Sequence, residues 1–361
     1  MPSCRSSTKG SHRSGRLDRL GRVSADLEIR PIDLLDDTRL RAAERWVGIH
    51  ADVQRELFGD RGSSWTLEEI RAFHRSEEKL RVARAAWRGD EMVGALDVIM
   101  PRADNTSLAV LWLSVDPDHR GRGIGSALLT EAERVGAEHG RSVFNAETEW
   151  ARGGADVSER FARARGFEIG LTMLRSDLTL PVDRDALGAV LSGVRDDYGF
   201  ESFVDEMPQE WLEDRAVLQQ RMTTDAPSDD LDIEEEVWDA DRLWASHERS
   251  RASGRRIVET VARHLPSGRL VGFTSVSVSA GEPDLAYQQD TLVLREHRGH
   301  GLGLRLKAVN ALRLMDELPL VTSVRTWNAA SNTHMLAVNR RLGYTVDGYS
   351  REWQKPAVMR R

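Results

Sequence analysis

The sequence contains very little of the chemistry that builds disulfide-linked or metal-bound frameworks. Its 361 residues include one cysteine, Cys4. A single cysteine excludes a disulfide framework, a CxxC redox pair and a cysteine-based zinc cluster within one chain. Cys4 lies in a polar stretch that offers nothing to activate a thiolate nucleophile. His119 and His297 have no coordinating partners spaced nearby, so we expect no bound metal.

Long apolar runs and an excess of positive charge are also missing. No apolar run approaches the roughly 20 residues that a transmembrane helix needs. The formal net charge is −7, whereas nucleic-acid-binding proteins are usually basic. Residues 1–26 begin with a basic, polar stretch that lacks the apolar core of a secretory signal and the apolar content to pack. We therefore expect a disordered tail, a cytoplasmic location, and neither a membrane nor a nucleic-acid partner.

A short glycine-rich run, in contrast, occurs twice. Residues 119–125 read HRGRGIG and residues 297–303 read HRGHGLG. Each run follows an apolar, strand-like stretch and precedes a helical pattern. Glycines allow positive φ and close approach of a ligand, and the first turn of a helix offers unpaired N–H groups. Both runs are therefore interpreted as cradles for a bound phosphate group.

The spacing within these runs narrows the choice of phosphate motif. A P-loop requires Lys and Ser or Thr after its last glycine, but Ser126 and Leu304 stand there. The pattern that fits is R-x-x-G-x-G, which begins at Arg120 and again at Arg298. It resembles the acetyl-CoA-binding signature of the GNAT superfamily of N-acetyltransferases. The simpler alternative is a glycine-rich turn that binds nothing.

The resemblance implies that each loop holds the pyrophosphate of coenzyme A and that the preceding strand pairs with the pantetheine arm. It also implies acetyl-CoA as co-substrate. The cofactor-binding residues expected on this basis are Val115, Arg120, Gly121, Arg122, Gly123, Ile124 and Gly125 in the first half, and Val293, Leu294, Arg298, Gly299, His300, Gly301, Leu302, Gly303 and Asn332 in the second. Arg305 and Lys307, just beyond the second loop, are interpreted as side chains of a solvated helix face that could meet phosphate.

The two halves of the chain carry the same landmarks. Three glycines recur 177 or 178 residues later: Gly94 as Gly272, Gly125 as Gly303 and Gly166 as Gly343. A constant offset predicts two copies of one α/β unit. We expect two tandem GNAT domains with mixed α+β sheets at residues 27–180 and 197–361, joined by a linker at 181–196.

Local patterns add detail to this architecture. Thr66 and Glu69 have the spacing of a capping box before a helix. Residues 167–179 are predicted to form a final strand pair that completes the first half. Residues 225–241 contain nine carboxylates and no basic residue, which predicts a solvated loop with one short element around Val237 and Trp238.

The second half matches the family pattern better than the first. The resemblance implies an Asn at the start of a helix, which hydrogen-bonds the pantetheine amide, and a Tyr four residues before the Gly-Phe pair, which protonates the thiolate. Asn332 matches the first position, where the first half has Ala155. The Tyr position holds Asn339 in the second half and Ala162 in the first. We therefore expect the second half to be catalytic and the first to be degenerate.

The chemistry requires few groups. A neutral amine attacks the thioester carbonyl, and backbone N–H groups around Val293 and Leu294 would stabilise the oxyanion. Asp290 and Glu206 in the second half are candidates for the proton acceptor, as are Glu147 and Glu149 in the first. Asn339 can donate a hydrogen bond but no proton at neutral pH. The acid therefore stays open among water, Tyr344 and Tyr349.

The predicted function is transfer of an acetyl or acyl group from acetyl-CoA to a primary amine of a small molecule. The negative net charge is compatible with a cationic acceptor. Two alternatives stay open. One is a non-catalytic acyl-CoA-binding or regulatory protein, since both halves lack the expected Tyr. The other is transfer to a protein lysine or N-terminus. The expected oligomeric state is a monomer or homodimer.

Overall fold

Both halves of the chain are mixed α/β units built in the same order. The computed structural model describes residues 26–192, 197–225 and 227–356. The first half contains β1 (Leu27–Pro31), α1 (Leu40–Phe58), α2 (Leu67–Arg75), β2 (Lys79–Arg88), β3 (Glu91–Pro101), β4 (Leu108–Val115), α3 (Ile124–Glu138), β5 (Val143–Ala151), α4 (Glu159–Ala164) and β6 (Glu168–Thr179). After α5 (Arg184–Leu191), the second half contains β7 (Tyr198–Val204), α6 (Leu212–Asp225), α7 (Ala240–Ala252), β8 (Arg256–His264), β9 (Leu270–Ser279), β10 (Glu282–Val293), α8 (Leu302–Glu317), β11 (Ser323–Ala329), α9 (Thr333–Leu342) and β12 (Thr345–Pro356).

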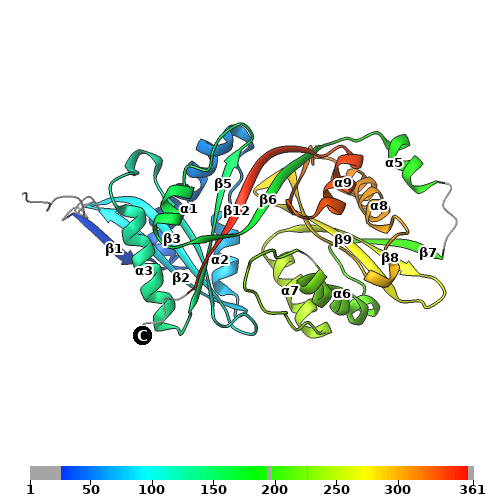
Figure 1. Ribbon diagram of the computed structural model, residues 1–361, viewed down its shortest axis with the longest axis horizontal. Coiled ribbons are helices and arrows are strands. Elements are labelled where there is room, and N and C mark those ends of the chain that lie inside the picture. The colour runs from blue at the N-terminus through cyan, green and yellow to red at the C-terminus, as the bar shows by residue number, and fades with distance from the viewer. Residues whose placement is uncertain (1–25, 193–196, 226, 357–361) are drawn as a thin grey trace, which may run out of the picture.

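The strands of both halves join into one 12-stranded sheet in the order β1-β2-β3-β4-β5-β12-β6-β11-β10-β9-β8-β7. The last strand of each half pairs with the other half. β12 lies between β5 and β6, antiparallel to both, and β6 pairs antiparallel with β11. Figure 1 shows the red β12 running beside the green β5 and β6 at the centre of the molecule. The halves are therefore linked by an exchange of their final strands.

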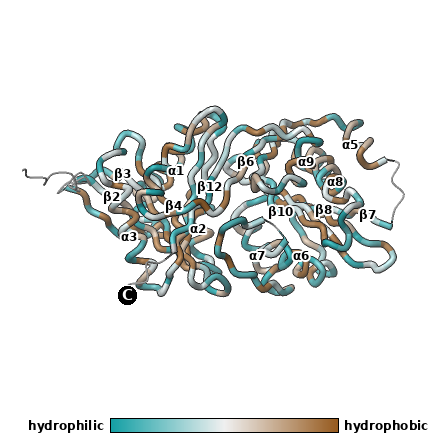
Figure 2. The backbone as a smooth tube through the Cα atoms, in the orientation of Figure 1, coloured by the Kyte–Doolittle hydropathy of each residue, from teal (hydrophilic) through white to brown (hydrophobic). Residues whose placement is uncertain are grey.

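Helices cover both faces of this sheet. In the first half, α1 and α2 bury Trp46, Ile49 and Ile70, whereas α3 buries Leu128 in a separate cluster. In the second half, α6 and α7 bury one cluster and α8 and α9 another. Figure 2 shows hydrophobic segments, coloured brown, along helices and strands of both halves. Each half thus has two packed layers of helix on sheet, as expected for a mixed α/β unit.

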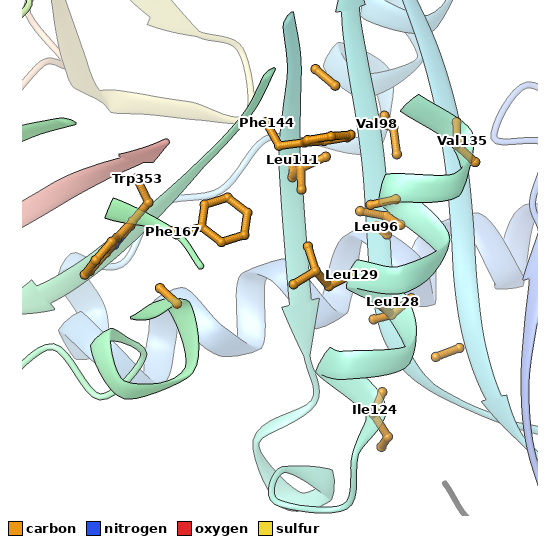
Figure 3. Packing of buried hydrophobic residues seen from close by; sticks show 14 of the residues in the cluster. Leu96, Val98, Leu111, Ile124, Leu128, Leu129, Val135, Phe144, Phe167 and Trp353 are labelled. Carbon is orange, nitrogen blue, oxygen red and sulfur yellow. The ribbon is translucent and has the colours of Figure 1, made fainter. Parts of the chain in front are cut away.

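The exchanged strand contributes to the core of the half it joins. Trp353 of β12 is fully buried and belongs to the first-half cluster that includes Phe144, Phe167 and Leu128. Figure 3 shows the Trp353 ring beside Phe167, on the side of the cluster away from α3. Apolar burial of this size stabilises a fold by roughly 2–3 kcal/mol per large side chain. The first half therefore depends on a residue near the end of the chain.

The structure confirms the predicted helix cap at Thr66 and differs from two other local predictions. The capping box is confirmed, because Thr66 Oγ1 accepts the Glu69 N–H and the Glu69 carboxylate accepts the Thr66 N–H. The short element around Val237 is wrong, since residues 231–239 form neither helix nor strand. Residues 168–179 form one strand rather than a pair, because β12 supplies its neighbour. The linker contains α5, and residues 1–25 of the predicted tail lie outside the described residues.

Candidate active site

Each half contains a fork between two parallel strands, and the glycine-rich loop lies at the open end. β4 pairs with β5 only from Leu108 to Leu111, so the rest of β4 diverges from its neighbour. In the second half, β10 pairs with β11 only from Leu285 to Tyr287. Beyond the paired residues, one edge of β4 and of β10 has no strand partner. An extended ligand could therefore hydrogen-bond along either fork.

The second cradle is open at its glycines. Gly299 and Gly301 have φ of +88° and +68°, which L side chains rarely adopt. Gly303 has no heavy atom within 4 Å of the position that a Cβ would take. The first N–H that donates into α8 is that of Arg305, to the Gly301 carbonyl at 3.2 Å. Within the described part of the chain, no protein acceptor receives the N–H groups of residues 299–303, so they remain available for an anion.

The first cradle has the same backbone form but is partly covered. Gly121 and Gly123 have positive φ, and Gly123 caps α3 in the left-handed conformation. The ring of Phe161, from α4, lies 3.6 Å from the position that a Cβ of Gly125 would take. Arg165 donates a hydrogen bond to Ser126 in the first turn of α3. Together, Phe161 and Arg165 bring α4 against the start of α3.

The arginine of each signature fastens its loop to a helix. Arg298 bonds to Asp225 of α6 at 2.7 Å and donates to the Val293 carbonyl at 3.0 Å. Arg120 bonds to Glu56 of α1 at 2.6 Å. Neither guanidinium is therefore an uncompensated charge in this structure. Arg122 and His300 are exposed at the loop tips, and Ile124 and Leu302 begin the helices as buried anchors.

Of the two predicted oxyanion donors, Val293 and Leu294, only one has an N–H group that is free to serve. The N–H of Leu294 donates to the Val271 carbonyl of β9 at 2.9 Å, which removes it from the predicted site. Val293 lies opposite Gly272 in the next register position. Donors alternate in direction along an antiparallel strand, so the Val293 N–H faces the fork. In the first half, the Asp116 N–H donates to the Val93 carbonyl, as the Leu294 N–H does to Val271. The N–H of Val115 therefore faces the first fork, as that of Val293 faces the second.

A cavity of about 780 Å³ lies between the two halves, and we call it the chamber. Helices α2, α6 and α7 contribute to its walls, together with strands from both halves. Asp290 of β10 lines the chamber and accepts a hydrogen bond from Gln219 of α6 at 3.0 Å. Glu206 is not among the lining residues; its side chain is 82% exposed and lies 3.6 Å from Arg251. The chamber thus reaches one of the two bases predicted in the second half.

Asp290 of the second half has Trp112 at the equivalent position of the first half, 178 residues earlier. Trp112 also lines the chamber. The Trp112 ring stacks on His50 of α1 with 3.6 Å between centroids. His50 Nδ1 lies 2.8 Å from Ser114 Oγ, and burial lowers the pKa of His50 to about 3. The first half therefore has a neutral aromatic pair at this position, where the second half has a carboxylate and an amide.

The charges of the chamber do not balance. Each enclosed lining cation has a carboxylate partner: Arg81 with Asp97, Arg215 with Glu259, Arg249 with Glu78 and Arg255 with Glu69. Lys79, a further cation of the lining, is exposed. Among the described residues, Glu147, Asp290 and Glu352 line the chamber without a cationic partner. When these carboxyl groups are ionised, the chamber is therefore suited to a positively charged ligand.

Two of these carboxyl groups have shifted pKa values. The protein atoms around Glu147 desolvate its carboxyl group and raise its pKa to about 8, and repulsion from Glu149 adds to the shift. The side chain nevertheless keeps surface exposed to the open chamber. Burial also raises the pKa of Glu352. Glu149 lies outside the chamber lining and accepts hydrogen bonds from Gln54 at 2.5 Å and Trp327 at 3.4 Å. A carboxyl group with such a pKa readily exchanges a proton near neutral pH.

The remaining predicted residues lie between α8, α9 and β11. Asn332 caps α9 by accepting the Met335 N–H at 3.1 Å. Asn339 is buried, accepts a hydrogen bond from Lys307 at 2.8 Å and donates to Asn328 at 2.6 Å. The interpretation of Arg305 and Lys307 as solvated is wrong, because they are only 6% and 4% exposed. Lys307 follows Leu304 and precedes Ala311 at the spacing of a buried stripe, which was the available signal.

The two tyrosines that could serve as the acid differ in their surroundings. Tyr344 is buried, and burial raises its pKa above the ordinary value. Tyr349 stacks on Trp150 of the first half, with 5.5 Å between ring centroids. Neither tyrosine lines the chamber. No group of three or more potential metal ligands occurs within residues 26–192, 197–225 and 227–356, and no helix in these ranges could cross a membrane.

Comparisons with known proteins agree with this architecture. Residues 46–167 match the acetyltransferase (GNAT) family. A tandem GNAT protein from the clavulanic acid biosynthesis pathway, solved without AcCoA, is 27% identical with a TM-score of 0.76, over 92% of this chain and 99% of that one. A GCN5-related N-acetyltransferase from Sphaerobacter thermophilus shares the fold at 16% identity and a TM-score of 0.64, over 93% and 98% of the two chains. No curated protein sequence matches.

Proposed function

Since this chain is a tandem protein of the GNAT acetyltransferase superfamily, we propose that it transfers an acetyl group from acetyl-CoA to a primary amine of a small molecule. The family supports acyl transfer from an acyl-CoA donor in general. The amine acceptor and the choice of the second half as the catalytic one are our proposals. The observation that carries them is the pairing of an open second cradle with a carboxylate, Asp290, on the strand that leads to it.

The second cradle fits the diphosphate of the donor better than the first. Its N–H groups at residues 299–303 have no acceptor among the described residues, and Gly303 adjoins open space. Phe161 covers the corresponding Gly125. The family match falls in the first half, so sequence similarity alone does not choose the catalytic half. The difference in access at the two glycines favours the second.

The chamber supports a small cationic acceptor. Its volume of about 780 Å³ falls within the roughly 300–1,000 Å³ typical of small-molecule sites. Asp290 would attract an ammonium group, and Glu147 and Glu352 would do so once they lose their protons. This charge balance also disfavours the non-catalytic alternative, because an acyl-CoA-binding protein without an acceptor has no use for an acidic chamber. A protein lysine as acceptor would require a peptide segment to enter the same cavity.

The residues suggest a simple sequence of events. Asp290 takes a proton from the bound ammonium, and Gln219 holds the Asp290 carboxylate toward the chamber wall. The neutral amine then attacks the thioester carbonyl within a ternary complex. The Val293 N–H stabilises the oxyanion, and Asn332 at the start of α9 is a donor for the pantetheine arm. Acetyl-CoA supplies the activated acyl carbon, so no covalent enzyme intermediate is needed.

A matched pair of substitutions tests which cradle is used. Gly303→Glu and Gly125→Glu each place a carboxylate in the first turn of a helix, where the positive end of the helix dipole stabilises a negative charge. A Cβ at Gly303 would meet no heavy atom within 4 Å, and a Cβ at Gly125 would make ordinary contacts with Phe161 and Val115 at 3.6 Å. Neither glycine has positive φ. We expect Gly303→Glu to weaken acetyl-CoA binding by about tenfold to a hundredfold in calorimetry, because it competes with the diphosphate for the N–H groups. Gly125→Glu should leave binding and thiol release unchanged. The opposite pattern would assign catalysis to the first half.

A further inference from the structure

Lys307 is a buried cation without a carboxylate partner among the described residues. Its side chain lies on α8 and is 4% exposed. Nζ donates to Asn339 Oδ1 at 2.8 Å and lies 5.1 Å from the centroid of the Tyr344 ring. A buried ammonium costs several kcal/mol of folding free energy unless it is paired, on the order of the desolvation penalty for one ion. Such a residue calls for an explanation beyond packing.

The first half shows that the fold does not need a lysine here. The corresponding residue of α3, 178 positions earlier, is Leu129, which is buried in the first-half core. The partner Asn339 corresponds to Ala162, which is also buried. A leucine and an alanine therefore fill the positions that Lys307 and Asn339 occupy in the second half. The polar pair belongs to what the second half does rather than to the architecture that both halves share.

The position of Lys307 connects the cradle with the fork. Lys307 follows Gly303 by four residues, so both lie on one face of α8. The hydrogen-bond chain from Lys307 through Asn339 ends at Asn328, on the part of β11 that diverges from β10. Gln288, on the diverging part of β10, lines the same cavity of about 10 Å³ as Lys307. Lys307 is thus connected to both arms of the fork, to β11 through Asn339 and to β10 across the small cavity that it shares with Gln288.

The groups around Lys307 leave its charge uncompensated. Tyr344 of β12 stays neutral because burial raises its pKa. Asn339 of α9, Asn310 of α8 and Gln288 of β10 are uncharged, and the other side chains of the small cavity are apolar. Burial alone lowers the pKa of Lys307 to about 7. Lys307 therefore loses its proton at a lower pH than an ordinary lysine does.

We propose that Lys307 is the proton donor for the thiolate that leaves when the acyl group is transferred, with Asn339 as the residue that positions it. This inference rests on the proposed function. The bond between the amine nitrogen and the acyl carbon forms, the carbon–sulfur bond breaks, and the sulfur takes a proton from Lys307 Nζ. The acceptor ammonium loses two protons on its way to the amide. The first goes to Asp290 before the attack, and the second leaves the nitrogen of the tetrahedral intermediate to water. Lys307 is left as a neutral amine and regains this second proton through water, so charge and atoms balance.

Ultraviolet absorbance of the bound thiolate tests this proposal without turnover. Coenzyme A is titrated on the wild-type protein and on Lys307→Met, a neutral side chain of similar length that removes a buried charge and should fold. An ammonium within about 4–6 Å lowers the pKa of a thiol by about 1–3 units. We expect the bound thiol to ionise at least about one pH unit lower in the wild type than in Lys307→Met. Leu129→Met, which makes the change to Met at the equivalent position of the first half, is the matched control and should resemble the wild type.

A pH profile of kcat gives the second readout. In the wild type, kcat should fall as pH rises through about 7, because Lys307 loses the proton that it donates. In Lys307→Met, kcat should be lower by about a hundredfold and lack that fall. Equal thiol ionisation and equal profiles in both proteins would overturn the proposal for Lys307 and leave the proposed function intact. Failure of coenzyme A to bind at the second cradle, tested by Gly303→Glu, would instead overturn the proposed function.

Discussion

Glu147 of β5 and Glu352 of β12 lie directly opposite each other on neighbouring antiparallel strands, one from each half of the chain. Both side chains line the chamber. Like charges in directly opposed positions destabilise a sheet, so this pair is unfavourable unless a proton or a cation lies between the carboxyl groups. The strand exchange is what brings the two together, because each carboxyl group comes from a different half.

The first prediction concerns the pH dependence of acceptor affinity. With its pKa raised to about 8, Glu147 gains its negative charge as pH rises through 8. The KM for a cationic amine should therefore fall as pH rises from 6 toward 8, while the amine itself is still protonated. Glu147→Gln should raise KM by about tenfold at pH 8, the cost of one charge-assisted contact, and remove this trend. Glu168→Gln, an exposed site on β6, is the control. A Glu147→Gln profile that still follows the wild type would contradict the assignment.

The second prediction concerns the exchanged strand. Trp353→Ala removes a fully buried indole from the first-half core and should cost about 3–5 kcal/mol of unfolding free energy. Hydrogen exchange should show the loss first in β5, whose register with β12 runs from Val143 to Ala151. Trp65→Ala, at a side chain that is 40% exposed, should cost much less. If protection fell only in the second half, β12 would not complete the first-half sheet in solution.

The duplication of the α/β unit can be predicted from the sequence, but the exchange of the final strands, β6 and β12, cannot. Gly125 and Gly303 mark two equivalent turns, and each turn has a left-handed glycine before a helix. The strands β6 and β12 occupy the same place in each repeat. A duplicated pattern fixes where a strand falls within the unit but not which copy it pairs with, since either copy presents a similar edge.

The chamber could not be predicted from the sequence, because its acidic groups come from strands that meet only after the exchange. Glu147 and Glu352 are 205 residues apart in the chain and become neighbours only through the register of β5 with β12. Asp290 can be predicted because it lies on the cradle strand, a local feature. The charge of Lys307 favours a solvated position, whereas its place in the sequence favours a buried one. Its spacing with Leu304 and Ala311 pointed to the buried face of α8.

The third prediction distinguishes Asp290 from Glu206, the other base predicted in the second half. Asp290→Asn removes the only one of the two carboxylates that reaches the chamber. It should lower kcat by about a hundredfold or more while the Kd for acetyl-CoA stays unchanged, because Asp290 lies away from the diphosphate cradle. Glu206→Gln should have little effect, as its side chain is 82% exposed. Steady-state rates combined with calorimetry distinguish these outcomes. A larger loss in Glu206→Gln than in Asp290→Asn would exclude Asp290 as the base.

The last prediction concerns the first cradle. Phe161 covers Gly125, and Arg165 ties the same segment to Ser126. If the ring is what closes this cradle, Phe161→Ala should expose the free N–H groups at the start of α3 and raise the acetyl-CoA stoichiometry in calorimetry from one toward two. The Phe161 side chain is 37% exposed, so its truncation should cost less than about 2 kcal/mol of unfolding free energy. Val157→Ala removes a 69% exposed side chain from the segment before α4 and should leave the stoichiometry at one. Two molecules bound to the wild type would show that Phe161 already moves aside. One molecule bound to Phe161→Ala would mean that the backbone of the first loop, and not the ring, prevents binding.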